Sequence, residues 1–183
     1  MPNNHFSFKQ FTIFQDKSSF KVGTDGVLLG AVGAVNGAKK ILDIGTGTGL
    51  IAIMLAQRSE AGIVAIEPDE ESYKQACDNV TLCPWSSRID VENSDFQSYN
   101  PGKEKFDLIV TNPPYFTNSL KNPDTRKSSA RHNDSLTSVE ILKGATKILE
   151  VDGKLQLILP MPKEIFLLLK HRSLVCIAII CLK

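Results

Sequence analysis

Residues 40–58 read KILDIGTGTGLIAIMLAQR, and this stretch decides the fold. A short apolar run is followed by glycines at positions 45, 47 and 49, and then by a stretch with helical apolar periodicity. Glycine lets the backbone turn tightly and approach a ligand near the N-terminus of a helix. The stretch therefore predicts a strand, a ligand-binding turn and a helix, in that order.

The same alternation continues along the chain on the C-terminal side of this stretch. Apolar runs that predict strands alternate with amphipathic segments that predict helices. Near the end of the pattern, Ser135 or Thr137 is expected to cap a helix, and Glu140 stands three residues after Thr137, the spacing of a capping box. The pattern is typical of an α/β protein with a doubly wound, Rossmann-like parallel sheet, whose ligands bind beyond the carboxyl ends of the strands. The segments read GIVAIEP (62–68), DEESYKQACDNV (69–80), RIDVENSDF (88–96), FDLIVTNPP (106–114), SLTSVEILKGATKILEV (135–151) and KLQLILP (154–160).

Length and composition limit the kind of protein. A chain of 183 residues predicts one domain, and the net charge of +1 excludes a generally basic nucleic-acid coat protein. The N-terminus shows no secretory signal, and no apolar stretch is long enough to span a membrane, so we expect a cytoplasmic protein. The four cysteines form no zinc-binding pattern, and we expect no metal.

The glycine turn carries the first chemical signal. A dinucleotide fingerprint would need glycine where Leu50 stands, and a phosphate-binding P-loop would need a lysine that is missing. The spacing Asp-x-Gly-x-Gly-x-Gly instead resembles motif I of the S-adenosylmethionine-dependent methyltransferases. This resemblance implies a class I methyltransferase fold and S-adenosylmethionine as cofactor. The cofactor-binding residues that it implies here are Asp43, Gly45, Gly47, Gly49, Glu67, whose carboxylate accepts from the ribose hydroxyls, and Asp95, near the adenine amino group.

Asn112-Pro113-Pro114-Tyr115 carries the second signal, at the end of the fourth strand of the core pattern. The two prolines end the strand and stiffen the backbone. The Asn112 side-chain oxygen and the Pro113 carbonyl can accept both protons of a planar amine, and Tyr115 offers a face for stacking. The motif resembles that of the amino-group-directed methyltransferases, in which all four residues are catalytic and Asn112 also contacts the cofactor. These enzymes act on adenine N6, cytosine N4 or the glutamine amide.

The N-terminal segments FKQF (8–11) and FKVGTDGVLLGA (20–31) narrow the family. Together with IAIMLAQR, FDLIVTNPPYF and LILP, they strongly resemble the bacterial tRNA adenine-N6 methyltransferases that modify the adenine 3′ of the anticodon of a valine tRNA. The resemblance covers roughly residues 6–160. It implies that Thr24 and Asp25 lie near the methionine end of the cofactor. It also implies a cofactor-covering extension over residues 1–35, a core over residues 39–160 and an atypical tail over residues 161–183.

The segment 117–135 follows the NPPY motif and is polar and basic. Its four basic residues against two aspartates leave a charge of +2. Since each neutralised phosphate strengthens RNA binding, we expect this segment to dock tRNA. The expected RNA-binding residues are Lys121, Arg126, Lys127 and Arg131.

The C-terminal tail departs from the family pattern, because family members continue well past the fifth strand. The chain therefore reads as a methyltransferase sheet apparently truncated after that strand, either as a natural end or as a frameshifted or truncated product. An open sheet edge is an aggregation hazard. We therefore expect residues 174–182 to fold back as a substitute strand. The oligomeric state cannot be read from the sequence.

Three other functions stay open at this stage. A protein-glutamine methyltransferase would carry the same NPPY motif, although only 42 residues precede Asp43 here, which leaves little room for a helical substrate-binding domain. A DNA or ribosomal RNA adenine methyltransferase fits the motif as well. The third alternative is an inactive remnant that binds the cofactor without transferring a methyl group.

Overall fold

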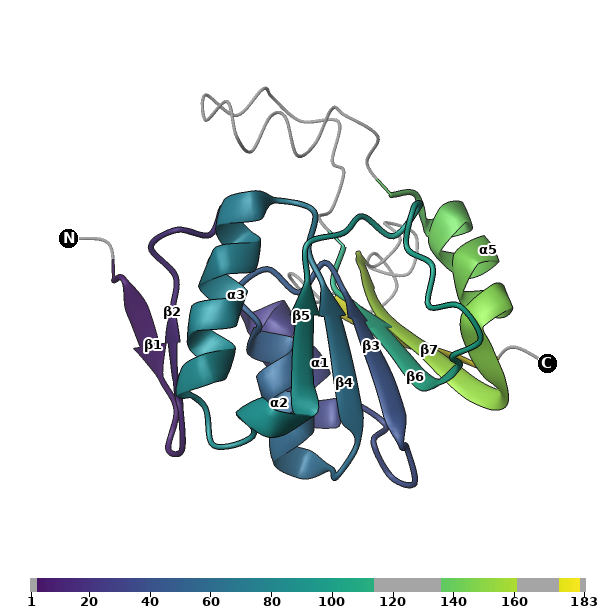
Figure 1. Ribbon diagram of the computed structural model, residues 1–183, viewed down its shortest axis with the longest axis horizontal. Helices are drawn as coiled ribbons and strands as arrows, with labels where there is room; N and C mark the ends of the chain where they lie inside the picture. The colour runs from purple at the N-terminus through teal and green to yellow at the C-terminus, as the bar shows by residue number, and fades with distance from the viewer. Residues whose placement is uncertain (1–2, 114–135, 161–174, 182–183) are drawn as a thin grey trace, which may run out of the picture.

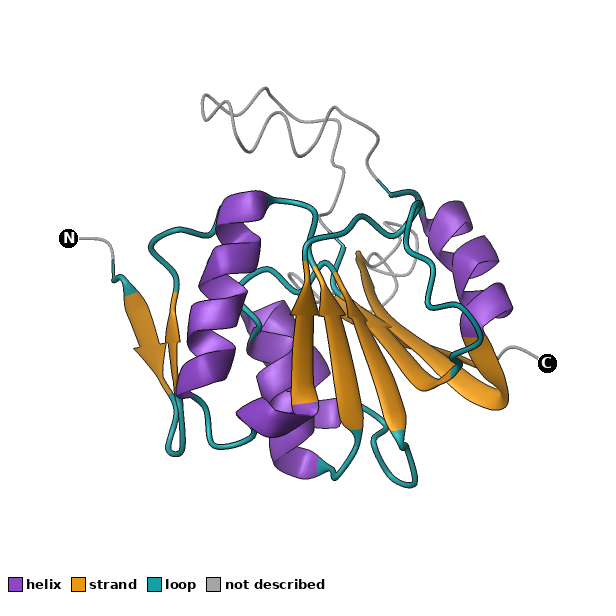
Figure 2. Cartoon of the chain, in the orientation of Figure 1, coloured by secondary structure: helices purple, strands orange, loops and turns teal. Residues whose placement is uncertain are grey.

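A computed structural model describes residues 3–113, 136–160 and 175–181 of the chain. In these residues a two-stranded N-terminal hairpin accompanies a six-stranded sheet flanked by helices (Figures 1 and 2). The elements are β1 (His5–Ser7), β2 (Thr12–Phe14), α1 (Thr24–Val32), β3 (Lys40–Ile44), α2 (Leu50–Arg58), β4 (Gly62–Ile66), α3 (Glu70–Leu82), η1 (Ser86–Arg88), β5 (Ile89–Glu92), β6 (Phe106–Thr111), α5 (Ser138–Ile148), β7 (Leu149–Pro160) and β8 (Val175–Cys181).

The large sheet has the strand order β5-β4-β3-β6-β7-β8. Strand β3 lies between β4 and β6 and pairs in parallel with both. Strand β5 pairs in parallel with β4, and β7 pairs in parallel with β6. The chain changes direction of travel across the sheet at β3, so the carboxyl ends of β3 and β6 flank the place where ligands bind in such sheets. The predicted α/β, Rossmann-like class is confirmed.

Helices cover both faces of the sheet (Figure 1). On one face, Leu29 of α1 and Ile53 of α2 belong to the apolar core that includes Ile41 of β3. On the other face, Ile141 of α5 packs in a second core with Leu42 of β3. Successive residues of β3 thus enter opposite cores, as the two-residue period of a strand requires. Helix α5 begins at Ser138 after the N-cap Thr137, and Thr137 forms a capping box with Glu140, one of the two predicted cap positions.

Strand β8 lies antiparallel beside β7. Seven residue pairs join the two strands, from Lys154 opposite Cys181 to Pro160 opposite Val175. The expectation that residues 174–182 fold back as a strand is confirmed, with bounds one residue shorter at each end. Because β8 occupies the edge of β7, the sheet continues past its fifth parallel strand. The predicted division into extension, core and tail stays a prediction.

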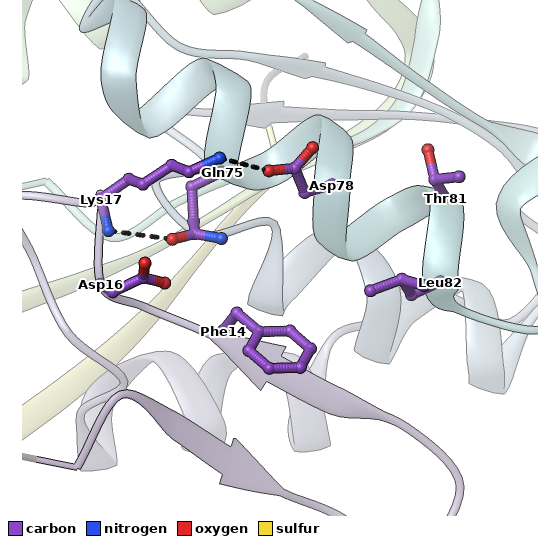
Figure 3. Close-up of a pocket in the computed structure, with 7 residues that line it drawn as sticks. All are labelled: Phe14, Asp16, Lys17, Gln75, Asp78, Thr81 and Leu82. Atoms are coloured by element: carbon purple, nitrogen blue, oxygen red, sulfur yellow. Dashed lines mark hydrogen bonds and ion pairs between the residues drawn. The ribbon is translucent and has the colours of Figure 1, made fainter.

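The N-terminal hairpin is fastened to α3 by buried amide side chains. Asn79 is fully buried, accepts from the Phe14 amide (2.9 Å) and donates to the carbonyl oxygens of Phe14 and Thr48 (2.8 Å each). Gln75 accepts from the Lys17 amide (3.0 Å), at the edge of a groove between β2 and α3 (Figure 3). The Asn79 side chain therefore joins the hairpin, α3 and the segment that precedes α2.

We expect Asn79→Ala to lower the free energy of unfolding by about 3 kcal/mol, because it leaves one buried and two part-buried backbone groups without this partner. Chemical denaturation measures this change. Asp78→Ala is the matched control on the same helix. It removes the exposed ion pair with Lys17 (2.7 Å), and solvent screening leaves such pairs little effect on stability. Equal losses in the two variants would contradict the role of Asn79.

Within residues 3–113, 136–160 and 175–181, no helix is both long enough and apolar enough to cross a bilayer.

Candidate active site

The turn after β3 has the backbone conformation that its glycines predict. Gly45, Gly47 and Gly49 have φ angles of +70°, +59° and +81°, in the left-handed region that favours glycine. The amides of Gly45 and Thr46 both donate to the carbonyl oxygen of Ile66 (2.9 and 3.1 Å), which ties the turn to the end of β4. A Cβ atom on Gly45 or Gly47 would have no neighbour within 4 Å among the residues that the structure describes. The space beside the turn is therefore open to a ligand.

Asp43 lies directly beneath this turn and is fully buried. Its Oδ2 accepts a hydrogen bond from the Thr46 hydroxyl (2.6 Å), while its Oδ1 has no partner in the described part of the chain. Burial raises the pKa of Asp43 to about 6, and the Thr46 hydroxyl and, more weakly, the Ala52 backbone amide oppose the rise. An unpaired buried carboxylate oxygen costs stability, which points to a role in ligand binding.

Glu67 follows β4 and is 8% exposed. Its Oε2 accepts from the Gly47 amide (2.8 Å) and its Oε1 from the Asp69 amide (3.1 Å). Burial raises the pKa of Glu67 to about 7, and the nearby Asp69 and Asp43 charges raise it further, while the two amide donors oppose the rise. Each oxygen keeps a free lone pair, so the carboxylate can accept from two hydroxyls beside the glycine turn.

Asn112 is brought to the same place by strand register. Thr111 of β6 lies opposite Ile44 of β3, and the Thr111 hydroxyl donates to the Ile44 carbonyl (2.9 Å). Gly45 directly follows β3 and Asn112 directly follows β6, so the two residues stand side by side where these parallel strands end. Neighbouring strands in a sheet lie about 4.8 Å apart. The Asn112 Oδ1 is buried and has no hydrogen-bond partner among the described residues. Pro113 is half-buried, and Pro114 and Tyr115 lie outside the described residues.

Thr24 and Asp25 form the first turn of α1. The next residue, Gly26, is buried, and a Cβ atom there would lie 3.3 Å from Leu50 Cδ2 and 3.9 Å from Asn112 Nδ2. The first turn of α1 therefore adjoins both the start of α2 and the Asn112 amide. Sequence reasoning singled out Thr24 and Asp25 and missed Gly26, which stands in the same quoted segment.

The remaining acidic candidate, Asp95, is exposed in the loop after β5. Its carboxylate accepts from the amide and the hydroxyl of Ser98 (2.8 Å each), and these bonds lower the pKa of Asp95. The nearby Asn93 was missed. Its Nδ2 donates to the Glu67 carbonyl (2.8 Å) and so joins the loop after β5 to the end of β4. The sequence signal that could have found Asn93 is its position as a polar residue directly after the carboxyl end of β5.

The predictions about RNA binding and metal binding concern the surroundings of the site. The expected RNA-binding residues lie outside the described residues; they are Lys121, Arg126, Lys127 and Arg131. In the segments that the structure describes, no three His, Cys, Asp or Glu side chains gather in a way that could hold a metal ion.

Comparisons with known proteins agree with this geometry. The family model of the methyltransferase small domain matches residues 12–172. The chain is 55% identical over 162 residues to the tRNA1(Val) (adenine(37)-N6)-methyltransferase of Bacteroides thetaiotaomicron, covering 87% of this chain and 68% of that protein. It is 51% identical to the protein of the same name from Trichodesmium erythraeum, covering 87% and 69%.

Solved structures show the same fold at low sequence identity. Pyrococcus horikoshii TYW2, in complex with MeSAdo, superposes with a TM-score of 0.62 at 18% identity over 88% of this chain and 56% of that chain. A putative RNA methyltransferase from the same organism gives a TM-score of 0.53 at 19% identity, covering 78% and 61%. The chain spans about two thirds of the length of the relatives named above and just over half of TYW2.

The fold and the site define a methyltransferase with the Rossmann-like architecture of class I. The chain belongs to the methyltransferase small domain family. The resemblance to the bacterial tRNA adenine-N6 methyltransferases is confirmed, because relatives carrying that name are about half identical to it over most of its length. The assigned roles of the individual site residues stay predictions.

Methyltransferases of this class use S-adenosylmethionine, and the residues present fit that cofactor. The open space beside Gly45 and Gly47 can receive its amino acid end. The unpaired Asp43 Oδ1 offers a buried negative acceptor beneath the turn, and the two oxygens of Glu67 match the two hydroxyls of a ribose. These three features come from adjacent strands at one edge of the sheet.

Proposed function

We propose that this chain methylates N6 of an adenine in tRNA with S-adenosylmethionine as the donor, and that the target is the adenine 3′ of the anticodon of a valine tRNA. The observation that carries the chemistry is the unpaired, buried Oδ1 of Asn112 at the residue beside the glycine turn. The named relatives support the choice of tRNA.

The chemistry requires a planar amine to present its lone pair, which is otherwise delocalised into the ring. When bound, S-adenosylmethionine supplies an electrophilic methyl group, and its transfer to N6 leaves S-adenosylhomocysteine and one proton. Asn112 Oδ1 and the Pro113 carbonyl accept the two amine hydrogens and stabilise the positive charge that develops on nitrogen. Tyr115 stacks on the base. No side chain has to remove a proton before attack, because the neutral amine is the nucleophile.

The cofactor is held by the residues that surround the glycine turn. Asp43 and the turn at Gly45 and Gly47 bind its amino acid end, and Glu67 accepts from the ribose hydroxyls. In the same proposal Asp95 accepts from the adenine amino group, so the carboxylate must exchange or share its hydrogen bonds to Ser98. Thr24 and Asp25 cover the methionine end from α1.

The RNA partner is proposed to bind next to the catalytic turn. The basic residues of segment 117–135 neutralise phosphates of the anticodon stem and loop. Bases in such a loop are already unpaired, so the enzyme presents adenine to Asn112 with little unstacking cost. We infer a cytoplasmic location from this substrate.

Glu67 predicts that cofactor affinity depends on pH. Ribose hydroxyls donate more strongly to the charged carboxylate than to the neutral acid, so binding lowers the pKa of Glu67 from about 7 and releases a proton. Affinity for S-adenosylhomocysteine should therefore rise as pH increases from 6 to 7.5 and then level off, with a slope approaching about tenfold per pH unit at the low end. Isothermal titration calorimetry across this range measures the effect.

Glu67→Gln is the matched control for this experiment. The amide keeps the shape of the side chain but cannot titrate, so the variant should bind more weakly with a flatter pH profile. The difference between the two profiles belongs to Glu67, because every other titrating group is common to both proteins. Identical profiles would contradict the assignment.

The proposed function is tested by incubating the purified chain with labelled S-adenosylmethionine and unmodified valine tRNA. Mass spectrometry of the digested RNA should detect N6-methyladenosine, and a transcript with guanosine in place of the target adenine should stay unmethylated. Label in protein instead of RNA would favour a protein-glutamine methyltransferase. Cofactor binding without transfer to any substrate would identify an inactive cofactor-binding protein.

A further inference from the structure

The candidate site has two halves that come from different strands. The half that would bind the cofactor joins β3 to β4, because the turn at Gly45–Gly49 donates two amide hydrogen bonds to the Ile66 carbonyl (2.9 and 3.1 Å) and one to the Glu67 carboxylate (2.8 Å). The half that would bind the amine begins at Asn112, directly after β6. The distance between the halves therefore depends on how the end of β6 is fixed to the end of β3.

The side chain of Thr111 connects these two strand ends. Thr111 is 1% exposed and lies opposite Ile44 in the last register pair between β6 and β3. Its hydroxyl donates to the Ile44 carbonyl (2.9 Å), and this hydrogen bond is buried. The residues that follow the pair are Gly45, which opens the turn, and Asn112. The hydroxyl thus joins the two halves one residue before each of them begins.

The backbone ladder gives this point little further support, because both strands leave the sheet here. Beyond Ile44 the chain takes up the left-handed conformation at Gly45 (φ +70°), whose amide bonds to Ile66 of β4. On the other strand, Pro113 has no amide hydrogen to donate to a further rung of the ladder. The ends of secondary-structure elements open more readily than their middles. A side-chain hydrogen bond at the last pair resists that opening.

We propose that Thr111 is a positioning residue for the methyl transfer, and that its hydroxyl keeps the Asn112 oxygen at the correct distance from the bound cofactor. This proposal rests on the proposed function, in which Asn112 accepts an amine hydrogen. A buried carbonyl that loses its donor costs free energy, so removal of the hydroxyl favours separation of the strand ends and access of water to the Ile44 oxygen. That movement displaces Asn112 and leaves the hydrogen bonds between the turn and β4 in place.

The first test separates the hydroxyl from the rest of the side chain. Thr111→Val removes the hydroxyl and keeps the branched shape, whereas Thr111→Ser keeps the hydroxyl and removes a methyl group. Thr111→Val should lower kcat about tenfold, since a misplacement of about 1 Å can cost about 100-fold. Its affinity for S-adenosylhomocysteine should stay within about threefold of wild type. Thr111→Ser should keep kcat within about threefold. Equal losses of kcat in the two variants, or a wild-type kcat in Thr111→Val, would overturn the proposal.

Thr81→Val is the matched control for the loss of a hydroxyl. The Thr81 hydroxyl also donates to a backbone carbonyl, that of Cys77 (2.8 Å), but it does so on α3. This variant should keep kcat within about twofold of wild type. A fall as large as that of Thr111→Val would overturn the proposal, because the loss of any such hydrogen bond would then be enough.

The second test asks whether Thr111 acts through Asn112. In an Asn112→Ala background, adding Thr111→Val should lower kcat no further in single-turnover kinetics, and an undiminished tenfold loss would overturn the proposal.

Hydrogen exchange followed by ¹⁵N NMR tests the proposed movement without any enzymatic activity. The backbone amides of the last residues of β6 should exchange faster in Thr111→Val than in wild type or Thr111→Ser. The amides of Gly45 and Thr46, which bond to β4, should keep their exchange rates. Unchanged exchange at the end of β6 would overturn the proposal. Because this measurement needs no methyl transfer, it separates failure of this proposal from failure of the proposed function.

Discussion

Replacing Asn112 with alanine should lower turnover about 100-fold or more, the loss expected when one preorganised transition-state acceptor is removed. The Asn112 Oδ1 is buried, lies next to the glycine turn and has no hydrogen-bond partner among the described residues, so its hydrogen bond to the amine forms in a site that excludes water. The affinity for S-adenosylhomocysteine should change by less than about threefold, because Asp43 and Glu67 are proposed to supply the polar contacts to the cofactor. Single-turnover kinetics and calorimetry measure the two quantities separately.

Asn112→Asp is the informative companion variant. Aspartate keeps an acceptor oxygen at the same distance from the backbone, and the amino-group-directed class resembled by this sequence carries either residue before its two prolines. We therefore expect Asn112→Asp to keep more activity than Asn112→Ala. Asn100→Ala, in the exposed loop before β6, should behave as wild type. If Asn112→Ala lost affinity and turnover in equal measure, misfolding of the site would be the explanation.

The order of strands and helices could be predicted because the central strands β3, β4 and β6 are mostly apolar runs that are buried on both faces. β3 illustrates this, since Ile41 and Leu42 enter different cores. The pairing of β8 with β7 followed from the cost of an open edge.

Contacts between distant segments could not be predicted from local pattern. Gln156 interrupts the apolar run of β7, yet it is fully buried and accepts from the Ala34 amide (3.0 Å) at the end of α1. Asn79 likewise satisfies backbone groups about 65 positions away. Both side chains answer hydrogen-bonding needs that exist only after the chain has folded.

The candidate site was predictable as far as it follows from strand ends. Asp43, Glu67 and Asn112 each stand at the carboxyl end of a parallel strand, and such ends meet at one edge of the sheet. Gly26 and Asn93 were missed, because their contacts depend on how α1 and the loop after β5 fold over that edge.

The second large effect is expected for Asp43→Asn, which should weaken S-adenosylhomocysteine binding about 100-fold at pH 8. Wild-type Asp43 is charged at this pH, because its pKa is about 6. Its unpaired Oδ1 is then a buried negative charge beneath the turn, available to the positive amino group of the ligand. The amide of asparagine keeps the hydrogen bond from Thr46 but carries no charge, so the loss of affinity reports the charge and not the shape.

The stability of the ligand-free protein should change much less in Asp43→Asn than a structural role of Asp43 would require. Keeping Asp43 charged in a fully buried position costs about 3 kcal/mol at 1.4 kcal/mol per pKa unit, and Asp43→Asn removes that cost. The new NH2 group has no partner in place of Oδ1, which costs about 1 to 3 kcal/mol. The two terms nearly cancel, so the unfolding free energy of the ligand-free protein should change by less than about 2 kcal/mol. If Asp43→Asn were strongly destabilised but bound the ligand with unchanged affinity per folded molecule, Asp43 would only stabilise the turn through Thr46. Weak binding in a protein of ordinary stability would show that the buried charge is retained for the ligand.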